Sequence, residues 1–334
     1  MTARLTLSRK QILAFRQRAG TLDERLPRGR RSLRRAAWCG LQDSMPRAAV
    51  LSIAARVAGV RPDVLDDPSL VQIWGPRYGV FVVPATDLAV FTLGAMPHDA
   101  KGRTKAEDTA ERLDTFLAGR TMTYAKAGHG MGVHPNSLRY GAATGRILIK
   151  WEGARAPLIW TVPAPAMGVD DARRELTRRY LHVYGPATPG AFARWAGIPP
   201  TKAAEAFGEL GIPVRTPIGE AWMLASDEAL ARAAPGPAAP ARLLPSGDAY
   251  WLFHGVEREL LVPDARRRGE LWTPRVWPGA VLVNGEIVGI WRRAHTAMSV
   301  QLWRKVSRAS RAAIEAEALA FPLSEGPAVV SWEG

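Results

Sequence analysis

The chain has 334 residues, a length that predicts two to four compact units rather than one small module. Hydrophobic residues make up 47% and charged residues 23%, as in an ordinary globular protein, and the single cysteine excludes an internal disulfide or a multi-cysteine metal site. The formal net charge of +14 favours a polyanionic partner whose binding weakens as salt rises.

The positive charge is concentrated at the start of the chain. Residues 1–35 hold eleven Lys and Arg residues against Asp23 and Glu24, a net charge of +9. Most are arginines, which suit bidentate contacts to phosphate. The alternative is that these arginines are only solvent-exposed surface residues. This segment lacks the apolar run of a signal peptide, and the chain has no stretch long enough to span a membrane, so we expect a cytoplasmic protein, nucleoid-associated when bound to DNA.

A recurring order of helices followed by a β-hairpin begins near the amino terminus. Helices are predicted over 7–20, where Ser8 is the N-cap, and over 32–41 and 46–59. A hairpin is predicted over 71–84, with its turn at Gly75 and Pro76. Helices followed by a hairpin are typical of a winged helix, a variant of the DNA-binding helix-turn-helix.

The same order returns twice, which predicts an α+β chain of three tandem winged-helix modules. In the second repeat, helices are predicted over 106–120 and 135–143, and strands over 146–151 and 157–162. In the third, helices are predicted over 170–184, 188–196 and 201–210, and strands over 214–215 and 221–224, with Thr188 as an N-cap. The predicted modules are 1–100, 101–167 and 168–230.

A Pro/Ala-rich segment, 231–241, is predicted to be a linker, and the pattern changes after it. Strands are predicted over 249–254, 259–262 and 279–291, the last with a hairpin turn at Asn284 and Gly285, and a helix over 307–321. Residues 242–334 are therefore predicted to form a small β-rich domain.

Three segments resemble the winged-helix crosslink-glycosylase family of AlkZ and YcaQ. They are GLQDS at 40–44, the third predicted module at 184–210, and the carboxy-terminal LLPSGDAYW (243–251) with WPGAVLVNGEIVGIWR (277–292). The resemblance spans nearly the whole chain. It implies three winged helices and a barrel-like β domain curved around a channel for DNA. It also implies monofunctional hydrolysis of the N-glycosidic bond of alkylated or crosslinked nucleobases, without metal or cofactor.

The sequence departs from that family at its signature motif. The motif is a glutamine, any residue, and then Gln or Asp, after Gly-Leu; here Gln42 matches its first position and Ser44 stands at the second. A serine hydroxyl can hold a water molecule but is a poor base. Asp43 is acidic, but neighbouring side chains point in different directions. Either the backbone shifts so that Asp43 serves, or the usual chemistry is missing; the candidate catalytic residues are Gln42, Asp43 and Ser44.

Other residues are candidates for contacts to double-stranded DNA. They lie in three places: the second helix and the residues just before it, the first predicted wing, and the second predicted recognition helix. They are Arg28, Arg30, Arg31, Arg34, Arg35, Arg77, Asn136 and Arg139. Trp195 and Trp251 have apolar neighbours and are expected in the core. His129 and His134 lack a nearby acid or cysteine and do not predict a metal site.

Two classes of function stay open. One is a DNA repair glycosylase; the other is a non-catalytic DNA-binding or regulatory relative with a degenerate active site. A regulator usually reads a symmetric operator as a dimer, and no heptad repeat or other dimerisation element is evident in the sequence. We therefore expect a monomer that binds duplex DNA without sequence preference.

Overall fold

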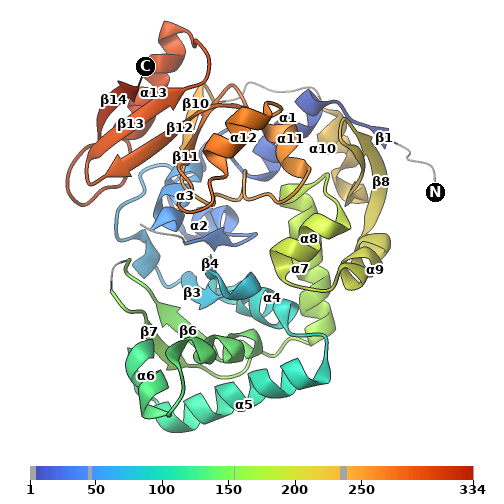
Figure 1. Cartoon of the computed structure of the whole chain (residues 1–334), viewed down its shortest axis with the longest axis vertical. Helices are drawn as coiled ribbons and strands as arrows, with labels where there is room; N and C mark the ends of the chain where they lie inside the picture. The colour runs from blue at the N-terminus through green and yellow to red at the C-terminus, as the bar shows by residue number, and fades with distance from the viewer. Residues whose placement is uncertain (1–4, 44–46, 154, 234–238, 334) are drawn as a thin grey trace.

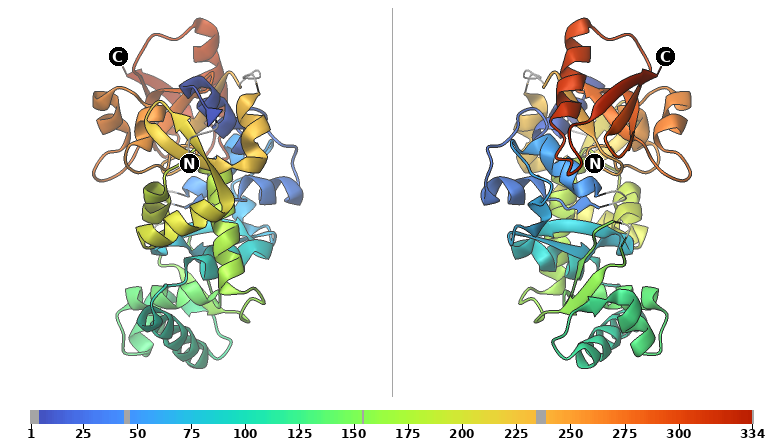
Figure 2. Two further views of the ribbon diagram at one scale, coloured as in Figure 1. Left: turned by 90° about the vertical axis from the view of Figure 1, so that its right-hand side faces the viewer. Right: turned by 90° about the vertical axis from the view of Figure 1, so that its left-hand side faces the viewer.

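The computed structural model describes residues 5–43, 47–153, 155–233 and 239–333. They form a mixed α/β fold around three sheets, and Figure 1 shows one elongated body with the carboxy-terminal sheet at one end and helices α5 and α6 at the other. Figure 2 shows the same two ends from the sides.

The first sheet has six strands and joins the first two predicted modules. Its order is β2 (Leu41–Gln42), β4 (Val80–Pro84), β3 (Leu70–Trp74), β6 (Ile147–Lys150), β7 (Leu158–Thr161) and β5 (Met122–Thr123). The two halves meet where Gln72 of β3 pairs with Ile149 of β6. The helices of this part are α2 (Arg30–Ala36), α3 (Ala48–Arg56), α4 (Leu88–Thr92), α5 (Ala100–Leu117) and α6 (Tyr124–Gly130).

The second sheet belongs to the third predicted module but begins with the amino terminus. Strand β1 (Leu5–Thr6) runs parallel to β8 (Gly211–Thr216), which forms an antiparallel hairpin with β9 (Gly219–Leu224). The helices here are α1 (Arg9–Ala19), α7 (Val169–Tyr184), α8 (Pro189–Ala196), α9 (Pro200–Leu210) and α10 (Glu228–Arg232). The N-caps predicted at Ser8 and Thr188 are confirmed, because each side chain accepts a hydrogen bond from the first turn of its helix.

The carboxy-terminal sheet is open and does not close into a barrel, so the predicted barrel-like domain is not confirmed. Its five strands follow in the order β10 (Ala241–Leu244), β11 (Gly279–Val283), β12 (Glu286–Ala294), β13 (Ala297–Leu302) and β14 (Val329–Glu333), and its two edge strands do not pair with each other. The helices are α11 (Glu257–Leu261), α12 (Ala265–Leu271) and α13 (Arg308–Leu319). The predicted turn at Asn284 and Gly285 is confirmed, since both have positive φ and join paired strands.

Several predicted elements differ from the structure. Residues 249–254 form turns rather than a strand, because they fold back on Asp248, whose backbone and side chain accept their amide hydrogens. The apolar run at 259–262 lies largely in α11, packed against α1, and short apolar runs do not separate strand from helix. Helix α2 ends at Ala36, before the predicted 41, and 135–143 is a run of 3-10 turns, Pro135–Thr144.

One apolar core connects these parts. An aromatic cluster from α7, α8 and α9 is at the centre of this core. In it, Tyr180 stacks on Tyr184 with 4.6 Å between the ring centroids. Tyr184 packs edge-on against Phe253 of the carboxy-terminal part, with 5.4 Å between the ring centroids. Trp195 and Trp251 are buried in the same core, as predicted. This core fixes α8 beside the loops that follow β10, and these elements surround the site described next.

Candidate active site

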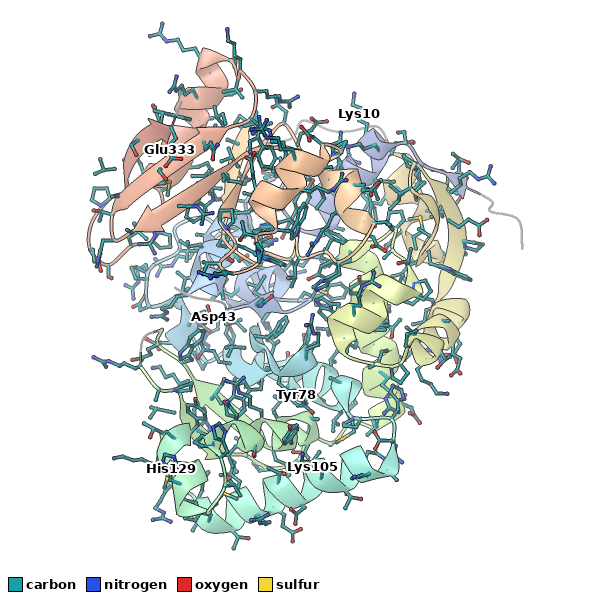
Figure 3. All side chains as sticks on the ribbon, in the orientation of Figure 1. Lys10, Asp43, Tyr78, Lys105, His129 and Glu333 are labelled. Atoms are coloured by element: carbon teal, nitrogen blue, oxygen red, sulfur yellow. The ribbon has the colours of Figure 1, made fainter. Side chains whose placement is uncertain are left out.

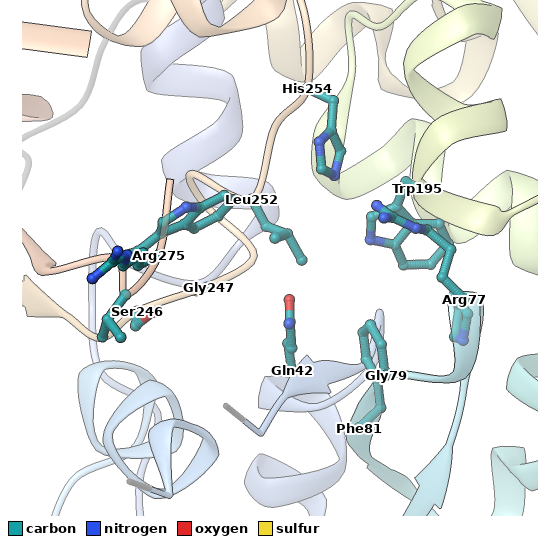
Figure 4. Close-up of a pocket in the computed structure, with 13 residues that line it drawn as sticks. Gln42, Arg77, Gly79, Phe81, Trp195, Ser246, Gly247, Leu252, His254 and Arg275 are labelled. Carbon is teal, nitrogen blue, oxygen red and sulfur yellow. The ribbon is translucent and has the colours of Figure 1, made fainter. Parts of the chain in front are cut away.

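A pocket in the described part of the chain lies where three distant parts of the sequence meet. It has a volume of about 490 Å³. The first sheet contributes Gln42, Phe81 and the β3–β4 turn, helix α8 contributes Trp195, and the carboxy-terminal part contributes the loops 246–254 and 275–277. Figure 4 shows Gln42, Arg77, Trp195, His254 and Arg275 around this space. Segments from all three stretches that carry the family resemblance therefore converge on one pocket.

The position of Gln42 follows from the backbone around Gly40. Gly40 has a φ of +75°, and a Cβ atom there would lie 2.9 Å from the ring of Phe91, so the turn needs glycine. Strand β2 then pairs with β4, with Gln42 opposite Phe81. Because side chains alternate along a strand, Leu41 is buried and the amide of Gln42 points into the pocket (Figure 4).

Asp43 lies on the other face and is not among the residues that line the pocket. Its side chain is buried in the middle of the molecule (Figure 3). One carboxylate oxygen accepts the amide hydrogen of Ala49 at 3.1 Å, and the other accepts from the side chain of Gln72 at 2.8 Å. The side-chain oxygen of Gln72 accepts in turn from the backbone of Trp151 at 2.6 Å. Asp43 thus ties β2 to α3 and, through Gln72, to the second half of the sheet.

The environment of Asp43 disfavours its charged form. Burial raises the pKa of this carboxyl, and the hydrogen bonds from Ala49 and Gln72 and the nearby Arg47 lower it. Burial outweighs them, so the pKa is raised overall from 3.8 to about 6. Ser44, the third candidate of the motif, lies outside the described residues. None of the described residues that line the pocket is an aspartate or a glutamate.

Arg77 enters the pocket from the turn between β3 and β4. Arg77 and Tyr78 both have left-handed backbone conformations, with φ of 56° and 59°, and the turn is closed by a hydrogen bond from Gly75 to Gly79. Gly197, at the end of α8, packs against the Arg77 side chain, so the turn and α8 support each other. Figure 4 shows the guanidinium beside Trp195 and facing the pocket.

His254, which belongs to no motif visible in the sequence, faces Gln42 across the pocket. Its partial burial, together with the charges of Arg77, Arg258 and Arg194, lowers the pKa of the imidazole from 6.5 to about 4. The side chain is therefore neutral near neutral pH and can hydrogen-bond but not act as a cation. Arg275, at the opposite rim in Figure 4, was also missed, because neither residue belongs to a recognisable motif.

The loop that carries Ser246 and Gly247 is held by a buried ion pair. Asp248 accepts two hydrogen bonds from the Arg56 guanidinium, at 2.7 and 2.8 Å, and one from the hydroxyl of Ser52 at 2.6 Å. Burial would raise the pKa of Asp248, but Arg56 and these hydrogen bonds hold it below its ordinary value. Through Asp248, the segment LLPSGDAYW (243–251) thus connects the wall of the pocket to α3.

The predicted DNA-contacting arginines of the amino-terminal segment do not line the pocket. Those on α2 and just before it are exposed: Arg28, Arg30, Arg31, Arg34 and Arg35. Other arginines of the basic segment are used inside the protein. Arg16 is buried and donates to the carbonyls of Gly185 and Pro186, while Arg9 and Arg25 pair with Glu286 and Glu317.

The candidates of the second half of the sheet also lie outside the pocket. Asn136 is exposed, and Arg139 is partly buried with its guanidinium over the ring of Trp74 at 5.6 Å. His129 is exposed and lies far from Asp43 in Figure 3. Within the described residues there is no group of three or more His, Cys, Asp or Glu side chains that would hold a metal ion. The described helices include none that is long and apolar enough to cross a membrane.

The glutamine of the sequence motif thus lies in a pocket between three parts of a mixed α/β fold. The chain belongs to the AlkZ-like DNA glycosylase family: the model of the family described as "DNA glycosylase AlkZ-like" matches residues 35–322. It is similar to the "Interstrand DNA cross-link repair glycosylase" of Streptomyces sahachiroi, with 24% identity over 84% of this chain and 86% of that protein. The solved structure of the Streptomyces sahachiroi DNA glycosylase AlkZ has the same fold, with a TM-score of 0.76, 20% identity, and coverage of 98% of this chain and 100% of that one.

Proposed function

We propose that the protein is a monofunctional DNA glycosylase that hydrolyses the N-glycosidic bond of alkylated or crosslinked nucleobases. The observation that carries the proposal is the placement of the Gln42 amide in a pocket built jointly by the segments that match the family. A volume of about 490 Å³ is in the range of small-molecule sites, so a nucleobase turned out of the duplex would fit there.

In this proposal Gln42 holds the attacking water. The water oxygen forms a bond to the anomeric carbon of the sugar, the glycosidic bond breaks with its electrons leaving on the base, and the water's surplus proton passes to the departing base or to solvent. The amide dipole of Gln42 orients the water and stabilises the positive charge that develops on the sugar. The described residues that line the pocket include no lysine, so they offer no amine for a Schiff base, which supports simple hydrolysis.

The remaining pocket residues would bind the DNA around the reacting sugar. Arg77 and Arg275 lie on opposite sides of Gln42 and are suited to phosphates that flank the extruded nucleotide (Figure 4). The neutral imidazole of His254 can donate or accept a hydrogen bond at the base. Asp43, which lies behind Gln42, would keep that strand in register rather than touch the substrate.

We extend the proposal to the wider DNA-binding surface. Helices α7, α8 and α9 followed by the β8–β9 hairpin have the order of a winged helix, as do α2 and α3 followed by β3 and β4. The exposed arginines around α2 would contact DNA phosphates as a monomer binds duplex DNA without sequence preference.

The decisive experiment is base release from a panel of duplexes that carry N7-alkylated purines or crosslinks. Excision leaves an abasic site that alkali cleaves, so each product appears as a shortened strand. Gln42→Ala should reduce the excision rate by about 10² to 10³, the usual cost of a positioned polar group in such a site, with DNA affinity little changed. Gln301→Ala, which removes a half-buried glutamine of β13 outside the pocket, is the matched control.

A second candidate function follows from the missing carboxylate. Among the described residues, those that line the pocket include neither Asp nor Glu, so a non-catalytic DNA-binding relative is the alternative. Ser44→Gln restores the family motif and separates the two. If the protein is a glycosylase, the wild type excises bases and Ser44→Gln excises them faster. If wild type and Ser44→Gln both bind the duplexes and leave every base in place, the alternative is correct.

A further inference from the structure

An exposed apolar side chain stands at the mouth of the pocket. Val276 lies in the loop between α12 and β11, and its 69% exposure is the highest among the large hydrophobic side chains of the described residues. It lines the pocket of Gln42 on one side and a smaller pocket of about 120 Å³, beside Ala48 and Leu51 of α3, on the other. The loop is therefore a ridge between two hollows.

The loop under Val276 is firmly held. The hydroxyl of Thr273 donates to the carbonyl of Val276 at 2.8 Å, and the indole of Trp277 donates to the carbonyl of Thr273 at 2.9 Å. Trp277 packs on buried Trp251, with 5.3 Å between their ring centroids. The guanidinium of Arg258 lies over the ring of Trp277 at 5.6 Å. A loop fixed in this way presents Val276 to the solvent without the freedom to turn it inward.

The charges beside the ridge match a nucleic-acid backbone. Arg275 precedes Val276, is exposed, and lies at the rim of the pocket opposite Arg77 (Figure 4). Single exposed hydrophobic residues are common on protein surfaces and need no function. Val276 differs because its loop is held by hydrogen bonds, it lines the pocket of Gln42, and Arg275 supplies a cation on the same loop.

We propose that Val276 is a wedge that enters the base stack and fills the gap left when the target nucleotide turns into the pocket. The inference rests on the proposed function, since it takes the pocket to be the site of an extruded nucleobase. Unstacking a base pair is costly, and an apolar side chain placed between base steps offsets part of that cost. Val276 is then a positioning residue, which acts on the extrusion step and not on the glycosidic bond.

The size of the effect follows from the side chain. Val276→Ala removes two methyl groups from an apolar contact, which should lower the extruded fraction of the target about tenfold, equivalent to about 1.4 kcal/mol. Affinity for undamaged duplex should change less than about twofold, because phosphate contacts dominate it. Excision from single-stranded DNA should not change, because no base pair has to be opened.

The test uses duplex DNA with the fluorescent base analogue aminopurine at the target position, since its emission rises when it leaves the stack. Val276→Ala is compared with wild type and with Val329→Ala, a valine of edge strand β14 that is 67% exposed and outside the pocket. Thermal unfolding of all three proteins checks that each is folded. Loss of the fluorescence rise in Val276→Ala alone, together with slower excision from duplex but not from single strands, supports the wedge.

Two outcomes overturn the wedge and one separates it from the proposed function. If Val276→Ala behaves like Val329→Ala, or if wild-type protein binds duplex without any rise in fluorescence, the wedge is wrong. If wild type raises the fluorescence, Val276→Ala does not, and no base is released from any duplex, then the wedge stands and the glycosylase proposal fails.

Discussion

Asp43→Asn tests whether Asp43 is a structural group behind Gln42. The substitution keeps the size of the side chain and an oxygen for the amide of Ala49, but it removes the titration of the carboxyl. In the wild type, the side-chain nitrogen of Gln72 donates to Asp43. The substitution places the amide nitrogen of the new asparagine near this donor. A constant loss of stability of about 1–3 kcal/mol is expected from that mismatch.

The pH dependence has a definite sign. The folded protein raises the pKa of Asp43 from 3.8 to about 6, so it holds the proton more tightly than the unfolded chain does. Stability contributed by the bound proton is therefore lost as pH rises from about 4 through about 6. The gap between the two pKa values corresponds to roughly 3 kcal/mol, so wild type should lose about that much relative to Asp43→Asn over this range.

Urea unfolding of both proteins at a series of pH values measures this difference. Asp67→Asn is a useful control because hydrogen bonds from Ser69 and the charge of Arg30 outweigh burial and lower the pKa of Asp67, so its pH dependence has the opposite sign. The excision rate is measured in parallel. If Asp43 only supports β2, Asp43→Asn keeps most of the activity at pH values where it is folded.

Two results would refute this reasoning. The first is a stability difference between wild type and Asp43→Asn that stays constant from about pH 4 to about pH 7, since the carboxyl would then not be held in a desolvated site. The second is loss of excision in a fully folded Asp43→Asn protein, with a wild-type rate that rises through about pH 6. That pattern would identify the carboxylate as part of the chemistry.

Three further predictions concern binding, stability and pH. Affinity for duplex DNA should fall by orders of magnitude between low and physiological salt. In a titration, the variant with alanine at Arg30, Arg31, Arg34 and Arg35 should show a weaker dependence of affinity on salt concentration. Undetectable binding of the wild type at low salt would contradict the prediction. Asp248→Ala leaves Arg56 buried without its partner and should lower the free energy of unfolding, measured in urea, by about 3–5 kcal/mol. The control Asp63→Ala breaks the exposed ion pair with Arg61 and should change this free energy little. Because the pKa of His254 is about 4, its protonation should not affect the excision rate between about pH 6 and 8. A wild-type rate that changes with pH in this range, together with a His254→Gln rate that does not, would disprove this.

Elements set by local chemistry could be predicted from the sequence. The cap of Ser8, the cap of Thr188 and the hairpin turn at Asn284 and Gly285 each depend on residues a few positions apart. Such patterns act within one element, so the helices and the hairpin that they begin or close are confirmed.

Elements set by distant contacts could not be predicted. The turns after Asp248 exist because its carboxylate is held by Arg56, almost two hundred positions away in the chain. Helix α11 packs on α1, and the Arg9 side chain of α1 donates to the carbonyls of Leu260 and Leu261. The same limit applies to charge: the amino-terminal arginines look alike in sequence, yet Arg16 is buried against backbone carbonyls and those of α2 are exposed.

The candidate site shows the same division. Gln42 was found because a motif surrounds it, whereas His254 and Arg275 become visible only when the fold brings 246–254 and 275–277 opposite β2. Two buried contacts maintain this arrangement: Asp43 with Gln72 holds the strand that carries the glutamine, and Asp248 with Arg56 holds the loops across from it. The contact of Asp248 with Arg56 joins two different predicted units, and Gln72 reaches a second unit through its hydrogen bond from the backbone of Trp151. The pocket is therefore a property of the whole folded chain, and neither the glutamine motif nor a winged helix alone would reproduce it.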